Sequence, residues 1–281
     1  MWRPRLLVTG DWHIGDERSA GVWRAGMLAA IGESHPDVVV VCGDICQRGT
    51  AEQARIAAAE CAGLGVLVVA VLGNHDYLSG AADEVAAILA EAGVVVLRGQ
   101  SVLLDLPGRG RLALVGAMGQ MEAVTPRQRH LVPAAEYDPV HYRRMLTHRS
   151  IRAATAVVSV LHVPGFKTAT SGEPEHLVEQ MFNPAMGRAV GRSRRVRLCL
   201  NAHCHRGCER YRTRSSGLRG RSASCRVTGT LTRTYELDPR TGRVATVHEG
   251  LPWPADLYDK PAPHPGPGVA PRPTSARNLA S

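Results

Sequence analysis

The sequence predicts a four-layer α/β/β/α sandwich built from two mixed sheets. Its first half alternates short apolar runs with helical segments, and a β-α-β-α-β-α order of this kind is typical of a parallel sheet with crossover helices. After Gly93 the strand-like runs leave little room for helices between them, which indicates a second sheet. The chain has 281 residues, 44% of them hydrophobic, and is therefore long enough to bury the core of such a fold.

The elements of the first half follow from apolar runs and helix-start signals. The run that follows Asp37 is uninterruptedly apolar, as expected for a strand buried on both faces. Thr50 and Gln53 fit a capping box at the start of a helix. We expect strands at residues 5–9, 37–42 and 65–72, and helices at 22–34, 50–62 and 81–92.

The second half is expected to contain shorter strands and two helical stretches. Pro107 and Gly108 mark a hairpin turn, and Asp138-Pro139 is a typical helix start within a polar stretch at 119–154. The segment 171–197 predicts an amphipathic helix followed by a cluster of arginines. We expect strands at residues 94–97, 101–106, 111–115, 156–161 and 196–200, and closing strands between 226 and 248.

The domain organisation and location follow from composition. Residues 1–250 are expected to form one domain, and residues 251–281, rich in Pro and Gly, a disordered tail. No apolar run approaches the roughly 20 residues that cross a bilayer, and the start of the chain does not resemble a signal peptide. The seven cysteines show no paired spacing of a secreted disulfide framework. We therefore expect a cytoplasmic protein without a membrane partner; its oligomeric state is left open.

The net charge of +9 has two interpretations. It favours a polyanionic partner, such as nucleic acid or a phosphorylated substrate. Alternatively, the excess of Arg over Lys reflects only the codon usage of the source. The arginine cluster at 188–197 is similarly open, because runs of charge are more often solvated faces than binding sites.

Five predicted strands each end in residues that can bind a metal ion or transfer a proton. The carboxyl ends of parallel strands are where α/β sheets place their chemistry, so these residues are expected to converge. Imidazole and oxygen ligands without thiolate suit Mn, Fe, Zn or Ni better than a structural zinc site. They are too many for one ion, whereas two ions that share a carboxylate account for the number. The residues are Asp11 and His13; Asp44; Asn74, His75 and Asp76; His162; and His203 and His205.

Two of these groups consist of residues two positions apart. In extended backbone, the side chains of Asp11 and His13 point the same way and could grip one ion, and His203 and His205 repeat this spacing. The alternative for the first pair is a loop Asp and a surface His.

These motifs resemble those of the calcineurin-like metallophosphoesterases. The family pattern of Asp-x-His, Gly-Asp, Gly-Asn-His-Asp/Glu, a lone His after a strand and Gly-His-x-His is similar to segments that occur here in the same order. They are Asp11-Trp-His13, Gly43-Asp44, Gly73-Asn-His-Asp76, His162 and Ala202-His-Cys-His205. The resemblance covers roughly residues 5–248 and implies the two-sheet sandwich and a phosphoester hydrolase, acting on monoesters or diesters.

The resemblance also implies a role for each residue. One ion would be held by Asp11, His13, Asp44 and His205, and the other by Asp44, Asn74, His162 and His203, with Asp44 bridging the two. Two such ions clamp a phosphoryl group and activate a water as hydroxide, which attacks phosphorus. His75 would protonate the leaving oxygen or stabilise the phosphoryl charge without binding metal, and Asp76 would orient a neighbour.

Two departures from the family pattern bear on function. Ala202 replaces the usual Gly before the last His pair, and its small side chain is expected to be tolerated. The residues after Asp44 lack the Asp-Arg-Gly of the Ser/Thr protein phosphatases, which argues against a protein phosphatase. Cys204 and Cys208 flank the last His pair, but their spacing fits no common zinc module.

Three functions remain to be compared. The first is hydrolysis of a small phosphorylated substrate, such as a nucleotide. The second is a nuclease, because the segment from Asp11 to Gly15 resembles the Asp-Trp-His-Leu-Gly of repair exonucleases, although the chain lacks an obvious capping domain. The third is a binding scaffold that has lost its catalytic groups; the presence of His75 and of every ligand argues against it.

Overall fold

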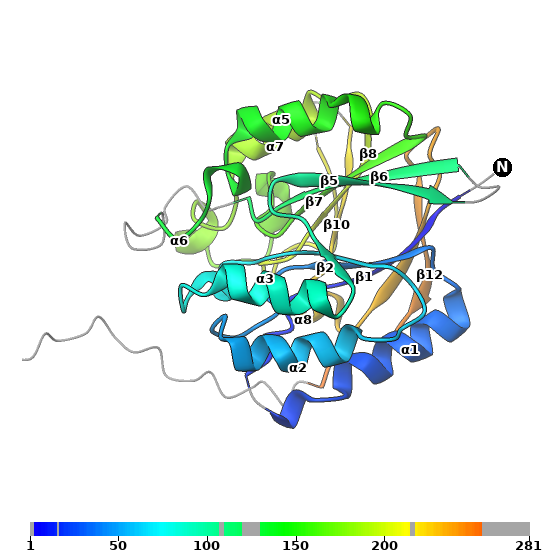
Figure 1. Cartoon of the computed structure of the whole chain (residues 1–281). Coiled ribbons are helices and arrows are strands. Elements are labelled where there is room, and N and C mark those ends of the chain that lie inside the picture. Colours follow the sequence, from blue (N-terminus) through cyan, green and yellow to red (C-terminus); the bar gives the residue numbers. More distant parts are fainter. Residues whose placement is uncertain (1–2, 16, 107–109, 120–129, 214–216, 255–281) are drawn as a thin grey trace, which may run out of the picture.

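The computed structural model contains two six-stranded sheets that face each other (Figure 1). It describes residues 3–254 apart from 16, 107–109, 120–129 and 214–216. In spatial order, the first sheet comprises β12 (Val244–Glu249), β11 (Arg233–Leu237), β1 (Arg5–Thr9), β2 (Val38–Cys42), β3 (Val68–Val71) and β4 (Val94–Val96). The second comprises β5 (Gln100–Leu106), β6 (Gly110–Ala117), β7 (Ala156–Leu161), β8 (Val196–Asn201), β10 (Arg219–Ser222) and β9 (Arg210–Arg212).

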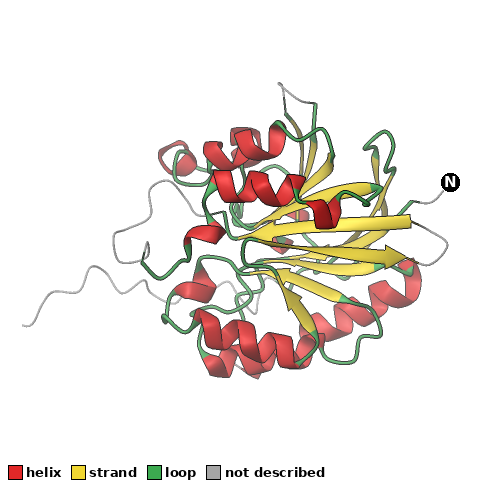
Figure 2. Cartoon of the chain, turned by 45° about the horizontal axis from the view of Figure 1, so that its top comes forward, coloured by secondary structure: helices red, strands yellow, loops and turns green. Residues whose placement is uncertain are grey.

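Helices cover the outer face of each sheet, so the predicted α/β/β/α layering is confirmed (Figure 2). On the first sheet lie α1 (Val22–Ser34), α2 (Ala51–Cys61) and α3 (Ala82–Glu91), and on the second α5 (Pro139–Thr147) and α7 (Pro184–Gly191). The short helices α6 (Glu175–Val178) and α8 (Cys225–Thr228) belong to loops. Within the described part of the chain, no helix is long and apolar enough to cross a membrane.

Apolar residues with a period of two create the layers. Val38 and Val40 of β2 point between the two sheets, whereas Val39 and Val41 point towards the helices of the first sheet. Every residue of β2 is buried, as expected for a strand covered on both faces. At Gly116 in β6 the sheets approach so closely that a Cβ atom would lie 2.6 Å from Val71 Cγ1.

The helix starts follow their capping residues. Asp138 accepts a hydrogen bond from the backbone N–H of Val140, as predicted for the start of α5. Thr50 Oγ1 accepts from Gln53 N at 3.3 Å and caps α2. The reciprocal half of the predicted capping box is absent, because Gln53 Oε1 accepts from the backbone of Arg48 instead.

Some expected boundaries differ from the observed ones. The strand expected at 65–72 is limited to Val68–Val71. Residues 226–228, expected to begin the closing strands, lie instead in α8 (Cys225–Thr228). Two short strands, β9 and β10, were not predicted, because each has few apolar residues. The turn at 107–109 and residues 120–129 of the stretch 119–154 lie outside the described residues.

The direction of the strands places the candidate site. Strands β1 to β4 are mutually parallel in the first sheet, and β6, β7, β8 and β10 are mutually parallel in the second. Their carboxyl ends therefore meet along one edge of the sandwich, where the polar residues that follow each strand come together.

Candidate metal centre

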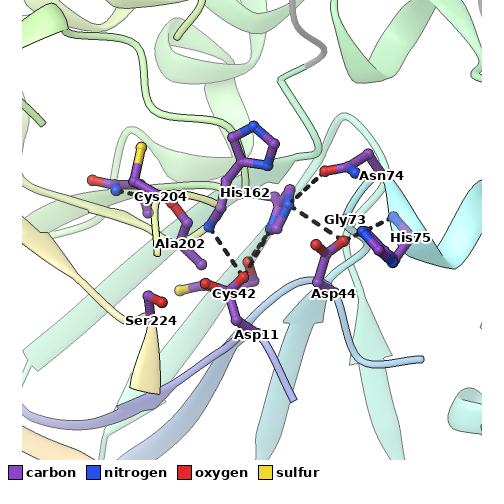
Figure 3. A network of polar contacts seen from close by, with 12 residues as sticks. Asp11, Cys42, Asp44, Gly73, Asn74, His75, His162, Ala202, Cys204 and Ser224 are labelled. Atoms are coloured by element: carbon purple, nitrogen blue, oxygen red, sulfur yellow. Dashed lines mark hydrogen bonds and ion pairs between the residues drawn. The ribbon is translucent and has the colours of Figure 1, made fainter. Parts of the chain in front are cut away.

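All the strand-end residues predicted as a site come together at this edge. Figure 3 shows Asp11, Asp44, Asn74, His75 and His162 converging from the loops that follow β1, β2, β3 and β7. Three overlapping groups of His and Asp offer ligand atoms that lie within 4.8 Å of one another in each group. They are Asp11, His13 and His205; Asp44, His162 and His203; and His13, Asp44 and His75.

The loops after β1 and β2 position the first carboxylates. Asp11 N donates to Gly43 O at 3.0 Å and His13 N to Asp44 O at 2.9 Å, so the two loops remain paired beyond the strands. Asp11, His13 and Asp44 have positive φ values of 57°, 48° and 49°. The expectation that Asp11 and His13 align through extended backbone is therefore wrong; the left-handed turns bring them together.

The ligand atoms of the first group lie close to Nε2 of His205. His205 Nε2 lies 3.3 Å from His13 Nε2 and 3.7 Å from Asp11 Oδ2. Asp44 joins this group through Oδ2, which lies 3.6 Å from His13 Nε2. His205 comes from the loop after β8, which places it opposite the β1 and β2 loops.

The second group uses the other oxygen of Asp44. Asp44 Oδ1 lies 3.3 Å from His162 Nε2, and Asn74 Oδ1 lies 3.0 Å from the same nitrogen. Burial is complete or nearly so for Asp44, His162 and His203. Asp44 thus presents one carboxylate oxygen to each group, which is the arrangement expected of a residue shared by two ions.

The ring of His162 is held by its other nitrogen. Nδ1–H donates to the carbonyl oxygen of Cys42 at 2.9 Å, which aims Nε2 at Asp44 and Asn74. A backbone carbonyl in this position fixes the tautomer and orientation that a metal-binding histidine needs. Gly43 makes room for the ring, since a Cβ atom there would lie 2.7 Å from His162 Nδ1.

The donor atoms fit metal ions in spacing and in chemistry. Two ligands that each lie about 2.1 Å from one ion are separated by about 3.0–3.4 Å, close to the distances of 3.3 Å within the two groups. Asp11 Oδ2 and His13 Nδ1 are buried and have no hydrogen-bond partner among the described residues. Buried carboxylate oxygens are costly to leave unpaired, so a cation near Asp11 would compensate this cost.

The pKa shifts keep three imidazoles of the site neutral and the carboxylate of Asp44 charged. Burial lowers the pKa of His13 and His205, and lowers that of His203 to about 3, so these rings are uncharged at neutral pH. For Asp44, burial disfavours the carboxylate, but the rings of His162, His75 and His13 outweigh burial and hold its pKa well below the usual range.

His75 lies beside His13 and Asp44. Its backbone N–H donates to Asp44 Oδ1 at 2.8 Å, and its ring Nδ1–H donates to Gln47 O at 2.9 Å. The ring meets that of His13 edge-on, with the ring centroids 4.5 Å apart. Because His75 also belongs to the third His/Asp group, its ring is close enough to serve either as a ligand or as a proton donor.

Asp76 connects two of the loops that carry the site. Its fully buried carboxylate accepts hydrogen bonds from the backbone N–H groups of Ile45, Cys46 and Gly73, at 2.7–3.2 Å. Burial, followed by the charge of Asp44, raises the pKa of Asp76 to about 6. The expectation that Asp76 orients a neighbour was not specific; the structure shows that it orients backbone rather than another side chain.

Two small residues permit the close packing of the loops. A Cβ atom on Gly73 would lie 2.1 Å from Asp44 Oδ1, so only glycine fits there. Ala202 occupies the position of the family's usual Gly and faces Gly10, where a Cβ atom would lie 3.1 Å from that of Ala202. The expected tolerance of Ala202 thus depends on Gly10.

Arg226 was missed by sequence reasoning, because it follows no strand-end motif. It lies in α8, next to Cys225, whose Sγ–H donates to Asp11 O at 3.3 Å. Its exposed guanidinium lies over the ring of Trp253, with Cζ 5.9 Å from the ring centroid, and its charge contributes to lowering the pKa of His13 and His205. A positive charge therefore lies beside the first group.

The cysteines near the site are not candidates for ligands. Cys204 is buried, and burial raises the pKa of its thiol, which disfavours the thiolate that binds metals. No cysteine belongs to the three candidate groups found among residues that the structure describes. The zinc interpretation of Cys204 and Cys208 is therefore not supported.

Comparisons with known proteins agree with this geometry. Residues 4–206 match the model of the calcineurin-like phosphoesterase family. No curated protein sequence matches the chain.

Solved structures of similar fold include a dimetal phosphatase from Danio rerio, 15% identical, with a TM-score of 0.60 over 89% of this chain and 97% of that one. Another is a phosphopantetheinyl hydrolase from Mycobacterium tuberculosis, 17% identical, with a TM-score of 0.52 over 90% and 98% of the two chains. An NAD nucleotidase from Haemophilus influenzae is 10% identical, with a TM-score of 0.54; the match covers 88% of this chain and 49% of the nucleotidase.

At these identities, the structural matches establish the fold alone. The family match is independent of them and spans more than half of the sequence, including every strand-end motif up to His205. The chain therefore belongs to the calcineurin-like phosphoesterase family.

Proposed function

We propose that this phosphoesterase hydrolyses a phosphate ester of a nucleotide or another small phosphorylated metabolite, with two divalent ions bound at the candidate centre. One ion would be held by Asp11, His13, Asp44 and His205, and the other by Asp44, Asn74, His162 and His203. The observation that carries the proposal is the carboxylate of Asp44, whose two oxygens face different ligand groups.

The residues of the chain prepare the centre before substrate binds. Neutral His13, His203 and His205 keep their lone pairs free, and the charged Asp44 offsets the positive charge of bound ions. Two divalent ions held there would neutralise charge on the phosphoryl group and lower the pKa of a bound water to about 7, providing a nucleophile at neutral pH.

His75 is proposed to transfer a proton to the leaving oxygen. Its Nδ1–H is held by Gln47 O, so Nε2 is the nitrogen that can face substrate. The hydrogen bond from its backbone to Asp44 fixes its position relative to the centre. General acids positioned in this way contribute roughly 10²–10⁴-fold to rate.

Arg226 supports an anionic substrate at the rim of the centre. Its guanidinium is exposed, lies over Trp253 and forms no ion pair with a carboxylate among the described residues. An unpaired cation at a binding site raises the local concentration of anionic ligands. We expect Arg226 to contribute to KM for phosphate esters more than to kcat.

The sequence similarity to repair exonucleases has a structural explanation. Trp12, which contributes to that similarity, is fully buried, stacks on Trp23 with centroids 5.1 Å apart and donates Nε1–H to Thr9 Oγ1. Its position in the core gives no preference for a nucleic acid substrate. The tryptophan in this motif therefore does not distinguish a nuclease from other phosphoesterases.

A substrate panel on metal-reconstituted protein tests the proposal. It comprises an aryl phosphate monoester, an aryl diester, a cyclic nucleotide, a nucleotide and single-stranded DNA, each assayed with Mn, Fe, Zn or Ni. We expect turnover of at least one small ester, lost in Asp44→Asn. Metal-loaded protein that hydrolyses none of these esters would contradict the proposed function.

A further inference from the structure

Two adjoining cavities flank α7 on the outer side of the second sheet. The first, of about 560 Å³, is lined by Phe166, Lys167, Phe182 and Arg188, among others. The second, of about 650 Å³, is lined mainly by residues around the start of β8 and β10. Gly191 and Arg192 line both, so the cavities meet at the end of α7. We call the two together the basic groove.

The second cavity is strongly cationic. Four arginines line it, and no Asp or Glu is found among the described residues that line either cavity; the arginines are Arg192, Arg194, Arg197 and Arg219. Arg219 donates to the carbonyl oxygen of Gly242, but the other three guanidiniums form no ion pair or hydrogen bond with the described part of the protein. Their charges are therefore available to a ligand.

A structural role explains only part of this cluster. Arg195 in the same segment donates to the carbonyl oxygens of Ile151, Arg152 and Ala154 and so stabilises the fold. Arg188 and Arg192 near the end of α7 interact favourably with its dipole, yet as like charges four residues apart they also repel each other. Neither effect explains Arg194 and Arg197, which lie in the following turn and strand.

The groove extends from the metal edge to the opposite edge of the sheet. The wall of the first cavity, residues 165–168, comes directly after the loop that carries His162. The second cavity lies at the starts of β8 and β10, which run in parallel towards the metal edge. Six residues of β8 span about 17 Å, so the groove is longer than a single nucleotide.

We propose that the basic groove binds a single-stranded nucleic acid, with its phosphates along the arginines and a base against Phe166. Repeated phosphates match cations that come from a helix, a turn and two strands, whereas a small polyphosphate would reach only one cavity. Phe166 is half-buried in the first cavity, which is otherwise largely apolar, and aromatic rings of this kind stack bases without sequence preference. A duplex would offer no unstacked base to this ring.

This proposal goes beyond the proposed function, because it adds a nucleic acid ligand for a groove outside the metal centre; a strand bound there would lead towards that centre. Hydrolysis of that strand rests on the proposed function, but binding does not. Chelated, metal-free protein therefore separates the two. Failure of binding alone would leave small-ester hydrolysis intact, and failure of hydrolysis in metal-loaded protein would leave binding intact.

The test measures fluorescence anisotropy of a short labelled oligothymidylate with full-length, metal-free protein over a salt series. Arg192→Gln/Arg197→Gln removes two groove charges. Arg55→Gln, an exposed arginine on α2 at the opposite outer layer, is the matched control. Thermal unfolding of each variant confirms that it folds.

We expect binding that weakens with salt, because each phosphate contact releases counterions. The double variant should bind more weakly, and the slope of log K against log salt should fall by about 1.4, or about 0.7 for each lost contact. Arg55→Gln should match the wild type. The proposal would be overturned if the wild type did not bind the oligonucleotide at the lowest salt, or if Arg55→Gln lost as much affinity as the double variant. It would also be overturned if inorganic tripolyphosphate bound and the oligonucleotide could not displace it.

Discussion

At the scale of single residues, His75 is the position where ligand and proton-donor roles are most easily confused. Its ring lies within reach of His13 and Asp44, yet its Nδ1–H is engaged by Gln47 O. We predict that His75→Ala keeps both metal ions and lowers turnover by roughly 10²–10⁴-fold. The loss should be largest for alkyl phosphates, whose leaving groups need the proton, and smallest for activated aryl esters.

The control for this prediction is His203→Ala, which should lose metal and activity together for every substrate. Metal content by elemental analysis and turnover of a matched alkyl and aryl pair distinguish the two variants. An emptied metal site in His75→Ala would show that His75 is a ligand. Unchanged turnover of the alkyl phosphate would show that it donates no proton.

His162 couples metal binding to pH. Burial disfavours its charged form, but the carboxylates of Asp44 and Asp11 outweigh burial and raise the pKa of His162 to about 9 from 6.5. In metal-free protein, the proton on His162 Nε2 faces Asn74 Oδ1 and Asp44 Oδ1. An ion that binds Nε2 must therefore displace this proton.

We predict that apparent metal affinity rises between pH 6.5 and about 9 and then levels off. The same proton stabilises the metal-free fold below pH 6.5, and this contribution is lost as the pH rises through about 9. Calorimetric titrations in buffers of different ionisation enthalpy should show proton release near pH 7.5. Affinity that is flat over this range would contradict the assignment of His162 as a ligand.

At the scale of elements, the site depends on loops rather than on the strands themselves. The loops after β2 and β3 carry Asp44 and Asn74, and Asp76 ties their backbones together through three N–H groups. The Asp76 carboxylate therefore sets the distance between Asp44, the proposed shared ligand, and Asn74, the proposed ligand of one ion.

We predict that Asp76→Asn lowers the free energy of unfolding by about 1–3 kcal/mol, because one buried N–H group loses its acceptor. Metal affinity should fall as well, since the two loops can separate. Chemical denaturation with chelator and metal titration measure the two effects. Asp105→Asn, at an exposed ion pair with Arg111, is the control and should change little. Full metal affinity in Asp76→Asn would show that Asp76 has no positioning role.

The sequence could predict those elements whose residues carry a local signal. The apolar runs of β1, β2 and β7 and the caps of α2 and α5 each define an element without reference to the rest of the chain. The convergence of the polar residues that follow these strands could then be predicted, because the carboxyl ends of parallel strands lie at one edge of a sheet.

Other features depend on tertiary contacts and could not be predicted. Strand β10 contains Gly220, and a Cβ atom there would lie 1.9 Å from the ring of Tyr211 in β9, so the two strands are specified by each other. The left-handed conformation of Asp11 and His13 likewise follows from pairing with the β2 loop, and Arg226 reaches the site through the packing of α8.

At the scale of the whole molecule, the two sheets and their helices form one sandwich with three apolar clusters. The cluster between the sheets joins strands from both halves of the sequence, including Val40 and Val158. We predict that residues 1–250 fold as one domain. Limited proteolysis should trim residues 251–281 and leave the remainder whole, as judged by mass spectrometry. An early, stable cut near residue 120 that releases two folded halves would contradict a single domain.

The central claim is that Asp44 is shared by two metal ions, and elemental analysis of reconstituted protein tests it most directly. Its Oδ2 lies 3.6 Å from His13 Nε2 and its Oδ1 lies 3.3 Å from His162 Nε2. We predict two divalent ions per wild-type chain and weakened binding of both in Asp44→Asn, because the amide carries no charge to share. No more than one ion in the wild type, or two tightly bound ions in Asp44→Asn, would contradict the claim.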